Sequence, residues 1–265
     1  MLHQVLPKPV AAPSLPAISA RAVLKTFAGK HEVKALEAVD LEIRPHEFVS
    51  ILGPSGCGKS TLLRIVAGLT PYEGGEVLVN QRPVKGPSPE IGVVFQSSNM
   101  LPWLTVGQNI ALGAKLRKIP EAQAAPKMAE LIAMLGLKGF ENNHPHQLSG
   151  GMRQRAAIGQ ILALDPQILL MDEPFGALDA LTRDKLNVEL LRIWQEQRQT
   201  VLLVTHSISE AVFLSDRVLV MSGRPGKVVR EVTIDLPRPR RPETIKAHPR
   251  YAEYMAELSQ LMGVY

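Results

Sequence analysis

The chain has 265 residues, 45% of them hydrophobic, which suits one α/β domain with a substantial core and room for an inserted subdomain. Its longest apolar runs fall far short of the roughly 20 residues of a membrane-crossing helix, so we expect no transmembrane segment. The single cysteine excludes an internal disulfide and suits a reducing cytoplasm. The net charge of +5 comes mostly from basic residues scattered among acidic ones, which argues against a nucleic-acid partner.

The chain opens with proline-rich residues 1–16, which lack the basic start and apolar core of a secretion signal, so we expect a disordered leader. Residues 21–25, 39–43 and 76–79 have the composition of strands and predict a small antiparallel β subdomain. Phe27 follows the first of these strands. Its ring either stacks on an adenine face or fills the core.

A glycine-rich motif lies between an apolar strand at residues 48–52 and a helical pattern at residues 62–67. It reads Gly53-Pro54-Ser55-Gly56-Cys57-Gly58-Lys59-Ser60-Thr61 and fits G-x-x-x-x-G-K-[ST]. Its glycines let backbone N–H groups turn toward an anion, and the helix adds its N-terminal dipole. We therefore expect a bound nucleoside triphosphate, with Lys59 on its β- and γ-phosphates and Ser60 on Mg²⁺. A plain turn is the alternative, which the Lys-Ser-Thr sequence disfavours.

The middle of the chain is expected to be a mainly helical insertion at residues 97–155. A strand at residues 91–95 ends at Gln96, and Pro102 then interrupts any helix. Helical patterns follow at residues 106–116 and 121–135. The segment Leu148-Ser149-Gly150-Gly151-Met152-Arg153-Gln154 leads into another helix.

Strands and helices alternate after the insertion, which indicates a parallel sheet covered by helices. Strands are expected at residues 168–171, 201–204 and 218–221, with amphipathic helices at 181–198 and 209–214 between them. The predicted fold is therefore an α/β P-loop NTPase core with a mainly parallel sheet, formed by residues 17–96 and 156–230.

Four side chains lie beyond the carboxyl ends of predicted parallel strands, where ligands of such sheets bind: Ser60, Gln96, Asp172 and His206. Asp172 is expected to hold Mg²⁺, and Glu173 to orient or deprotonate the attacking water. Gln96 can reach the metal or the water through its amide, and His206 can hydrogen-bond the γ-phosphate. An acidic pair that is merely part of a turn is the alternative for Asp172 and Glu173.

The segment from Leu148 to Gln154 resembles the signature sequence of the ATP-binding-cassette (ABC) family, and the other motifs follow in that family's order. Lys59 and Ser60 match its phosphate loop, Gln96 its Q-loop, and His206 its switch histidine. Asp172 and Glu173 match its acidic strand end, Ala177-Leu178-Asp179 its D-loop, and Phe27 its adenine-stacking aromatic. The resemblance covers about residues 18–230.

The resemblance implies that two subunits enclose two ATP molecules with Mg²⁺. Each site takes the phosphate loop from one subunit and Ser149, Gly150, Gly151 and Gln154 from the other, with Asp179 at the interface. Hydrolysis would then open the dimer.

A finer resemblance is to importer ATPases of the nitrate, sulfonate and taurine group, and it rests on four segments. They are the phosphate loop, Leu101-Pro102-Trp103-Leu104-Thr105-Val106, Met171-Asp172-Glu173-Pro174-Phe175-Gly176-Ala177-Leu178-Asp179 and Arg224-Pro225-Gly226. It implies transmembrane permease partners, an extracytoplasmic solute-binding protein met only indirectly, and a peripheral location on the cytoplasmic face of the membrane. Trp103 would face the permease; the alternative is that it fills the core.

Four positions depart from the family pattern: His46 where glycine is usual, Gly159-Gln160 where Ala-Arg is usual, and Ser207 where aspartate is common. The rival functions are a soluble ABC-type ATPase not coupled to transport, a nucleotide kinase, and a regulatory nucleotide-binding module without turnover. His144 and His146 flank Pro145, but no cysteine or acidic residue lies at ligand spacing, so a loop is expected there rather than a metal site.

Residues 231–265 form a basic, proline-rich tail with a short helix expected at residues 251–261. Its five clustered basic residues are Arg238, Arg240, Arg241, Lys246 and Arg250. We expect a solvated linker there rather than a patch that binds phosphate or lipid headgroups.

Overall fold

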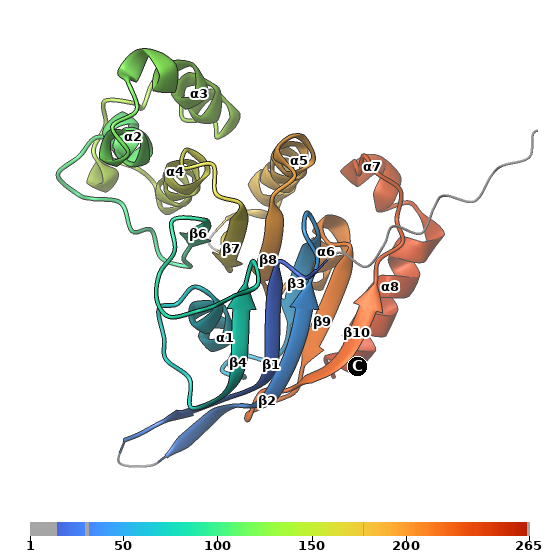
Figure 1. Ribbon diagram of the computed structural model, residues 1–265. Helices are drawn as coiled ribbons and strands as arrows, with labels where there is room; N and C mark the ends of the chain where they lie inside the picture. Colours follow the sequence, from blue (N-terminus) through green and yellow to red (C-terminus); the bar gives the residue numbers. More distant parts are fainter. Residues whose placement is uncertain (1–14, 30–31, 177, 264–265) are drawn as a thin grey trace, which may run out of the picture.

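The computed structural model describes residues 15–29, 32–176 and 178–263, which form two β-sheets surrounded by helices (Figure 1). Most of the expected leader, residues 1–14, lies outside the described residues. The larger sheet contains, in spatial order, β10 (Val228–Thr233), β9 (Arg217–Met221), β3 (Phe48–Leu52), β8 (Thr200–Val204), β7 (Ile168–Asp172) and β6 (Ile91–Val94). Its strands are parallel except β10, which pairs antiparallel with β9.

The central strands β3, β8 and β7 of the larger sheet are buried on both faces and are accordingly continuous apolar runs, whereas the edge strand β10 is mostly exposed. In β8 the side chains of Val201 and Leu203 join the core under the helices, whereas those of Leu202 and Val204 join a second core with helix α1 (Lys59–Val66). This alternation follows from the two-residue period of a strand. The sheet is thus a rigid platform whose carboxyl edge can carry a site.

The smaller sheet is antiparallel and confirms the expected β subdomain. Its spatial order is β2 (Val33–Ile43), β1 (Ile18–Phe27), β4 (Gly74–Val79) and β5 (Arg82–Pro83). It shares the second core with α1 and lies beside that helix in Figure 1. Phe27 at the end of β1 is 44% exposed, so it does not fill the core, and Lys25 Nζ lies 5.0 Å from its ring centroid.

The remaining helices lie mainly on the other face of the larger sheet. They are α2 (Val106–Leu116), α3 (Glu121–Met134), the 3₁₀ turn η1 (Pro145–Gln147), α4 (Gly150–Leu162), α5 (Ala180–Gln197), α6 (Ile208–Leu214), α7 (Pro242–Ile245) and α8 (Pro249–Leu261). Figure 1 shows α2 and α3 set apart beyond the β6 edge of the sheet. Helix α4 runs without interruption through residue 155, where we expected the insertion to end.

Two of the unusual positions have a steric explanation. A Cβ on Gly159 would lie 2.7 Å from Leu135 Cδ1, so the glycine lets α4 pack closely against the end of α3. His46 has φ of 65°, the left-handed region that glycine enters at little cost, which explains why glycine is usual there. Among the described residues, no helix combines the length and the apolar composition required to cross a membrane.

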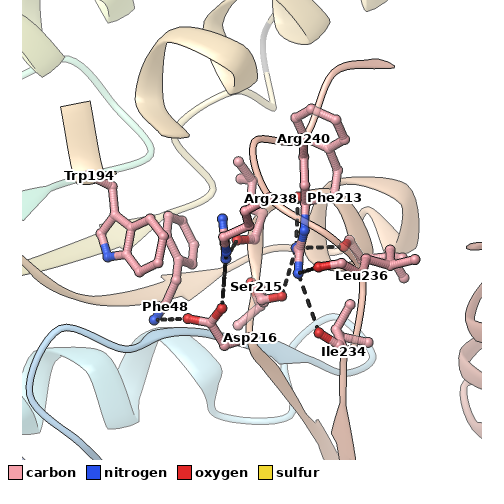
Figure 2. A network of polar contacts seen from close by, with 12 residues as sticks. Phe48, Trp194, Phe213, Ser215, Asp216, Ile234, Leu236, Arg238 and Arg240 are labelled. Carbon is pink, nitrogen blue, oxygen red and sulfur yellow. Dashed lines mark hydrogen bonds and ion pairs between the residues drawn. The ribbon is translucent and has the colours of Figure 1, made fainter. Parts of the chain in front are cut away.

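The prediction of a solvated tail is wrong for two of its arginines, because Arg238 and Arg240 form hydrogen bonds with the body of the protein (Figure 2). Arg238 donates to Asp216 Oδ1 at 2.7 Å and to Leu214 O at 2.9 Å, and its guanidinium carbon lies 4.3 Å from the Trp194 ring centroid. Asp216 Oδ2 also accepts from the backbone N–H of Phe48, the first residue of β3. The tail is therefore tied to the sheet and to α5.

Arg240 is only 3% exposed and donates to five backbone carbonyl groups. Three of them, at Val212, Phe213 and Ser215, belong to the C-terminal end of α6, where carbonyl groups lack partners within the helix and the helix dipole favours a cation. Burial lowers the pKa of Arg240 to about 9. This arginine is a buried anchor of the tail, a role that composition alone does not reveal.

Candidate nucleotide-binding and hydrolysis site

The glycine-rich loop connects the end of β3 to the start of α1. Gly58 precedes the helix with φ of 106°, and a Cβ there would lie 2.7 Å from Ala35 O, so glycine is needed for both conformation and space. Lys59 is buried, and its Nζ donates to the carbonyl groups of Gly53 at 2.7 Å and Pro54 at 2.9 Å. The backbone of the loop thus surrounds the amino group of Lys59, as expected of a phosphate-binding loop.

Ser60 and Asp172 meet at the carboxyl edge of the sheet. Ser60 Oγ donates to Asp172 Oδ1 at 2.7 Å. Burial raises the pKa of the Asp172 carboxyl above its ordinary value, and the hydrogen bond from Ser60 offsets part of that rise. A buried carboxylate next to a hydroxyl supplies the oxygen ligands that Mg²⁺ prefers, so these residues fit the expected ion.

Two of the three predicted catalytic side chains converge on a carboxylate oxygen of the third. Glu173 Oε2 lies 3.0 Å from Gln96 Nε2 and 3.3 Å from His206 Nδ1. Glu173 has φ of 46°, and its backbone N–H donates to Val204 O at 2.8 Å, which ties the end of β7 to β8. Left-handed backbone at a non-glycine residue is costly and is typical of functional sites.

The signature segment places a helix N-terminus on the helical subdomain. Ser149 is the N-cap of α4, and its Oγ accepts a hydrogen bond from the N–H of Met152 at 3.3 Å. A Cβ on Gly150 would meet nothing within 4 Å. Gln154 instead faces inward, because it is 4% exposed and its amide donates to Phe95 O at 3.0 Å.

Asp179 is the N-cap of α5, where its Oδ1 accepts a hydrogen bond from the Thr182 N–H at 2.9 Å. The same N–H lowers the pKa of the Asp179 carboxyl. Leu181 beside it is 76% exposed, so this end of α5 carries an apolar side chain into solvent. Ala177 of the predicted D-loop lies outside the described residues.

The structure thus joins Ser60 to Asp172, and Gln96 and His206 to Glu173, at one edge of the sheet. Ser149, Gly150, Gly151 and Phe27 lie on other elements, and among the hydrogen bonds of the described residues none links them to this group. No group of three or more His, Cys, Asp or Glu side chains in the described ranges is arranged to hold a metal.

Sequence reasoning assigned no site role to Arg224, whose Nε and Nη2 donate to Gly56 O at 3.0 and 2.9 Å. The order of the strands in the sheet is the information that would have placed Arg224 next to the phosphate loop. Strand β9 is parallel to and paired with β3, so the turn after β9 comes next to the loop after β3.

A glycine-rich loop between a strand and a helix, with a buried lysine and a Ser–Asp pair at the sheet edge, defines a P-loop nucleoside triphosphatase. The family described as "ABC transporter" matches residues 36–176. The chain belongs to this ABC transporter family of ATP-binding proteins, and it is an ATPase.

Three curated relatives are similar over most of their length. The aliphatic sulfonates import ATP-binding protein SsuB of Bacillus licheniformis is 45% identical, covering 84% of this chain and 87% of the relative. The taurine import ATP-binding protein TauB of Rhizobium johnstonii is 45% identical over 87% and 89%. The nitrate import ATP-binding protein NrtD of a Synechocystis species is 42% identical over 90% and 92%.

Among solved structures, the ATP-binding cassette MJ0796 is similar with a TM-score of 0.75 and 34% identity, covering 83% of this chain and 99% of that one. That structure is described as a dimeric post-hydrolysis state bound to ADP and Pi. The likeness confirms the predicted cassette fold.

Proposed function

We propose that this chain is the ATP-hydrolysing subunit of an importer of the nitrate, sulfonate and taurine group, acting through membrane permease partners. The observation that carries the proposal is the identity of 42 to 45% to SsuB, TauB and NrtD over 84% or more of this chain. Each of those three relatives is named as an import protein.

We assign the proposed hydrolysis to residues at the carboxyl ends of the parallel strands in the larger sheet. Lys59 leaves the carbonyl groups of Gly53 and Pro54 and binds the β- and γ-phosphates, which offer stronger charge-assisted bonds. Glu173 accepts a proton from the attacking water, while Gln96 and His206 hold its carboxylate in place. Ser60 and Asp172 would hold Mg²⁺, and the chemistry that the ion supplies when bound is neutralisation of charge on the phosphates.

The proposed ATP-bound state is a homodimer. Ser149, Gly150 and Gly151 stand at the N-terminus of α4, where unpaired backbone N–H groups and the helix dipole attract an anion. In the dimer this N-terminus binds the γ-phosphate held by the partner's phosphate loop. The dimeric form of MJ0796 supports this arrangement.

The proposed permease surface lies on the helical subdomain. Trp103 is 69% exposed and Leu116 is 75% exposed, so the core alternative for Trp103 is wrong. A groove of about 860 Å³ between α2 and α3 begins at Leu104, next to Trp103. An apolar side chain beside a groove suits a helix from a cytoplasmic permease loop. The subunit would then lie peripherally on the cytoplasmic face of the membrane, with the solute-binding protein on the opposite side.

The test is uptake by cells in which Trp103→Ala replaces the wild-type chain, together with capture of the tagged chain from detergent-solubilised membranes. Trp103→Ala is expected to lower solute uptake and permease recovery while the purified subunit keeps its ATPase rate. Val229→Ala removes another exposed apolar side chain, 57% exposed on β10, and is expected to change neither. Unchanged uptake together with absence of any captured permease would favour the rival, an ABC-type ATPase not coupled to transport.

A further inference from the structure

The turn between β9 and β10, residues 222–227, is packed against the backbone of the phosphate loop. A Cβ on Gly226 would lie 2.0 Å from Cys57 O, so only glycine lets the turn approach this closely. On the other side of the turn, Gly226 N donates to Ala35 O at 2.9 Å and Gly226 O accepts from Glu37 N at 3.0 Å. The turn is therefore fixed to strand β2 independently of its side chains.

Arg224 extends from this fixed turn onto the loop. Two of its N–H groups share the carbonyl oxygen of Gly56, at 3.0 and 2.9 Å. Because a trans peptide directs its C=O and its N–H to opposite sides, holding the Gly56 carbonyl fixes the plane that carries the Cys57 N–H. Gly56 has φ of 74°, a conformation that glycine adopts at little cost. Within the loop, the Cys57 N–H of this plane donates to Pro54 O at 3.3 Å, so the two shorter bonds from Arg224 add a second restraint on its orientation.

Within the described part of the chain, the Arg224 guanidinium forms no ion pair with a carboxylate, so its positive charge is not neutralised there. Lys227, the other cation of the turn, differs because its Nζ lies 3.0 Å from Glu37 Oε2. An uncompensated guanidinium beside a phosphate loop adds positive potential where a triphosphate binds.

We propose that Arg224 is a positioning residue of the ATP site, which orders the phosphate loop through Gly56 and thereby raises the affinity for nucleotide. It does not touch the reacting atoms, so its effect falls on binding rather than on the chemical step. The proposal concerns nucleotide binding by this chain alone and holds whether or not the subunit serves an importer.

The first test uses Cys57 as a reporter of loop order without nucleotide. Cys57 is the only cysteine of the sequence and is 1% exposed, so its alkylation requires the loop to open. Arg224→Gln is expected to raise the alkylation rate of the full chain about tenfold, the size expected for loss of a charge-assisted hydrogen bond. Lys227→Gln removes one positive charge from the same turn and is expected to leave the rate unchanged.

The second test compares KM for MgATP and kcat in the same variants. Arg224→Gln is expected to raise KM about tenfold with kcat unchanged, as for loss of uniform binding. Arg224→Lys keeps the charge but loses the two-donor fork, so an intermediate KM is expected. Equal alkylation in wild type and Arg224→Gln would overturn the proposal. An equal rise in KM for Lys227→Gln would overturn it too, because any cation of the turn would then suffice.

Discussion

The side-chain amide of Gln96 donates a hydrogen bond to the carboxylate of Glu173, with 3.0 Å between Nε2 and Oε2. Gln96 follows β6 and begins the segment that leads to the exposed Trp103, whereas Glu173 follows β7. A displacement of that segment therefore acts on the carboxylate through one bond. This gives the proposed permease surface a direct physical link to the proposed general base.

Replacing Glu173 with glutamine should stop turnover but not ATP binding. The amide keeps the shape of the side chain but cannot accept the proton of water, so hydrolysis is expected to fall at least about 100-fold. ATP-induced dimers should persist on a sizing column because the phosphate contacts remain. Phosphate release at the wild-type rate would remove Glu173 from its proposed role.

Ser149→Arg should separate ATP binding from dimerisation. The change places a long side chain at the N-cap of α4, in the space where the proposal puts the partner's γ-phosphate, and it costs about 1 kcal/mol of capping. The monomer should bind ATP with unchanged affinity, whereas light scattering should detect no ATP-dependent dimer. Gln123→Arg adds the same side chain to the exposed face of α3 and should still dimerise. Normal dimers of Ser149→Arg would refute the shared site.

Asp172→Asn should weaken Mg²⁺ binding and at the same time increase the free energy of unfolding of the nucleotide-free chain. Burial raises the pKa of Asp172, so between its ordinary value near 3.8 and the raised value the folded chain binds more protons than the unfolded chain. The free energy of unfolding therefore falls as pH rises through that window, and asparagine removes this loss.

The nucleotide-free Asp172→Asn chain should then melt at or above the wild-type temperature at pH 7, and the difference should shrink toward pH 4. The stabilisation by MgATP should be lost. Asp235→Asn, at an exposed carboxylate, serves as the control. A large drop in the melting temperature of nucleotide-free Asp172→Asn would show that the charged carboxylate stabilises the fold instead.

Arg240→Met should destabilise the fold because it leaves the carbonyl groups at the end of α6 without donors. We expect a loss of about 3 kcal/mol in the free energy of unfolding, which corresponds to a melting temperature lower by roughly 6 to 12 °C for a chain of this size. Arg241→Met changes the exposed neighbour and should shift melting little. Equal melting of both variants would mean that the burial cost of the Arg240 charge cancels its hydrogen bonds.

Apolar periodicity was sufficient to predict the parallel strands of the core and the helices between them, because buried strands such as β8 are continuous apolar runs. It did not predict β10, whose Val228–Thr233 sequence alternates too little and is half exposed at the sheet edge. Motif spacing led to Asp172, Glu173, Gln96 and His206 because parallel strands bring their carboxyl ends to one edge.

What the sequence could not reveal were contacts between segments far apart in the chain. The Pro–Arg run of the tail has the composition of a linker, and nothing local shows that helix carbonyl groups and the Trp194 ring are available to Arg238 and Arg240. The contact of Arg224 with Gly56 joins positions that only the strand order brings together.

The bond from the Phe48 N–H to Asp216, which Arg238 in turn holds, has a consequence during synthesis on the ribosome. Every nucleotide motif leaves the exit tunnel before the arginines that anchor β3 and α6. A nascent chain cut short before residue 238 would therefore carry the full set of motifs, while Asp216 and the carbonyl groups at the end of α6 would lack their arginine partners.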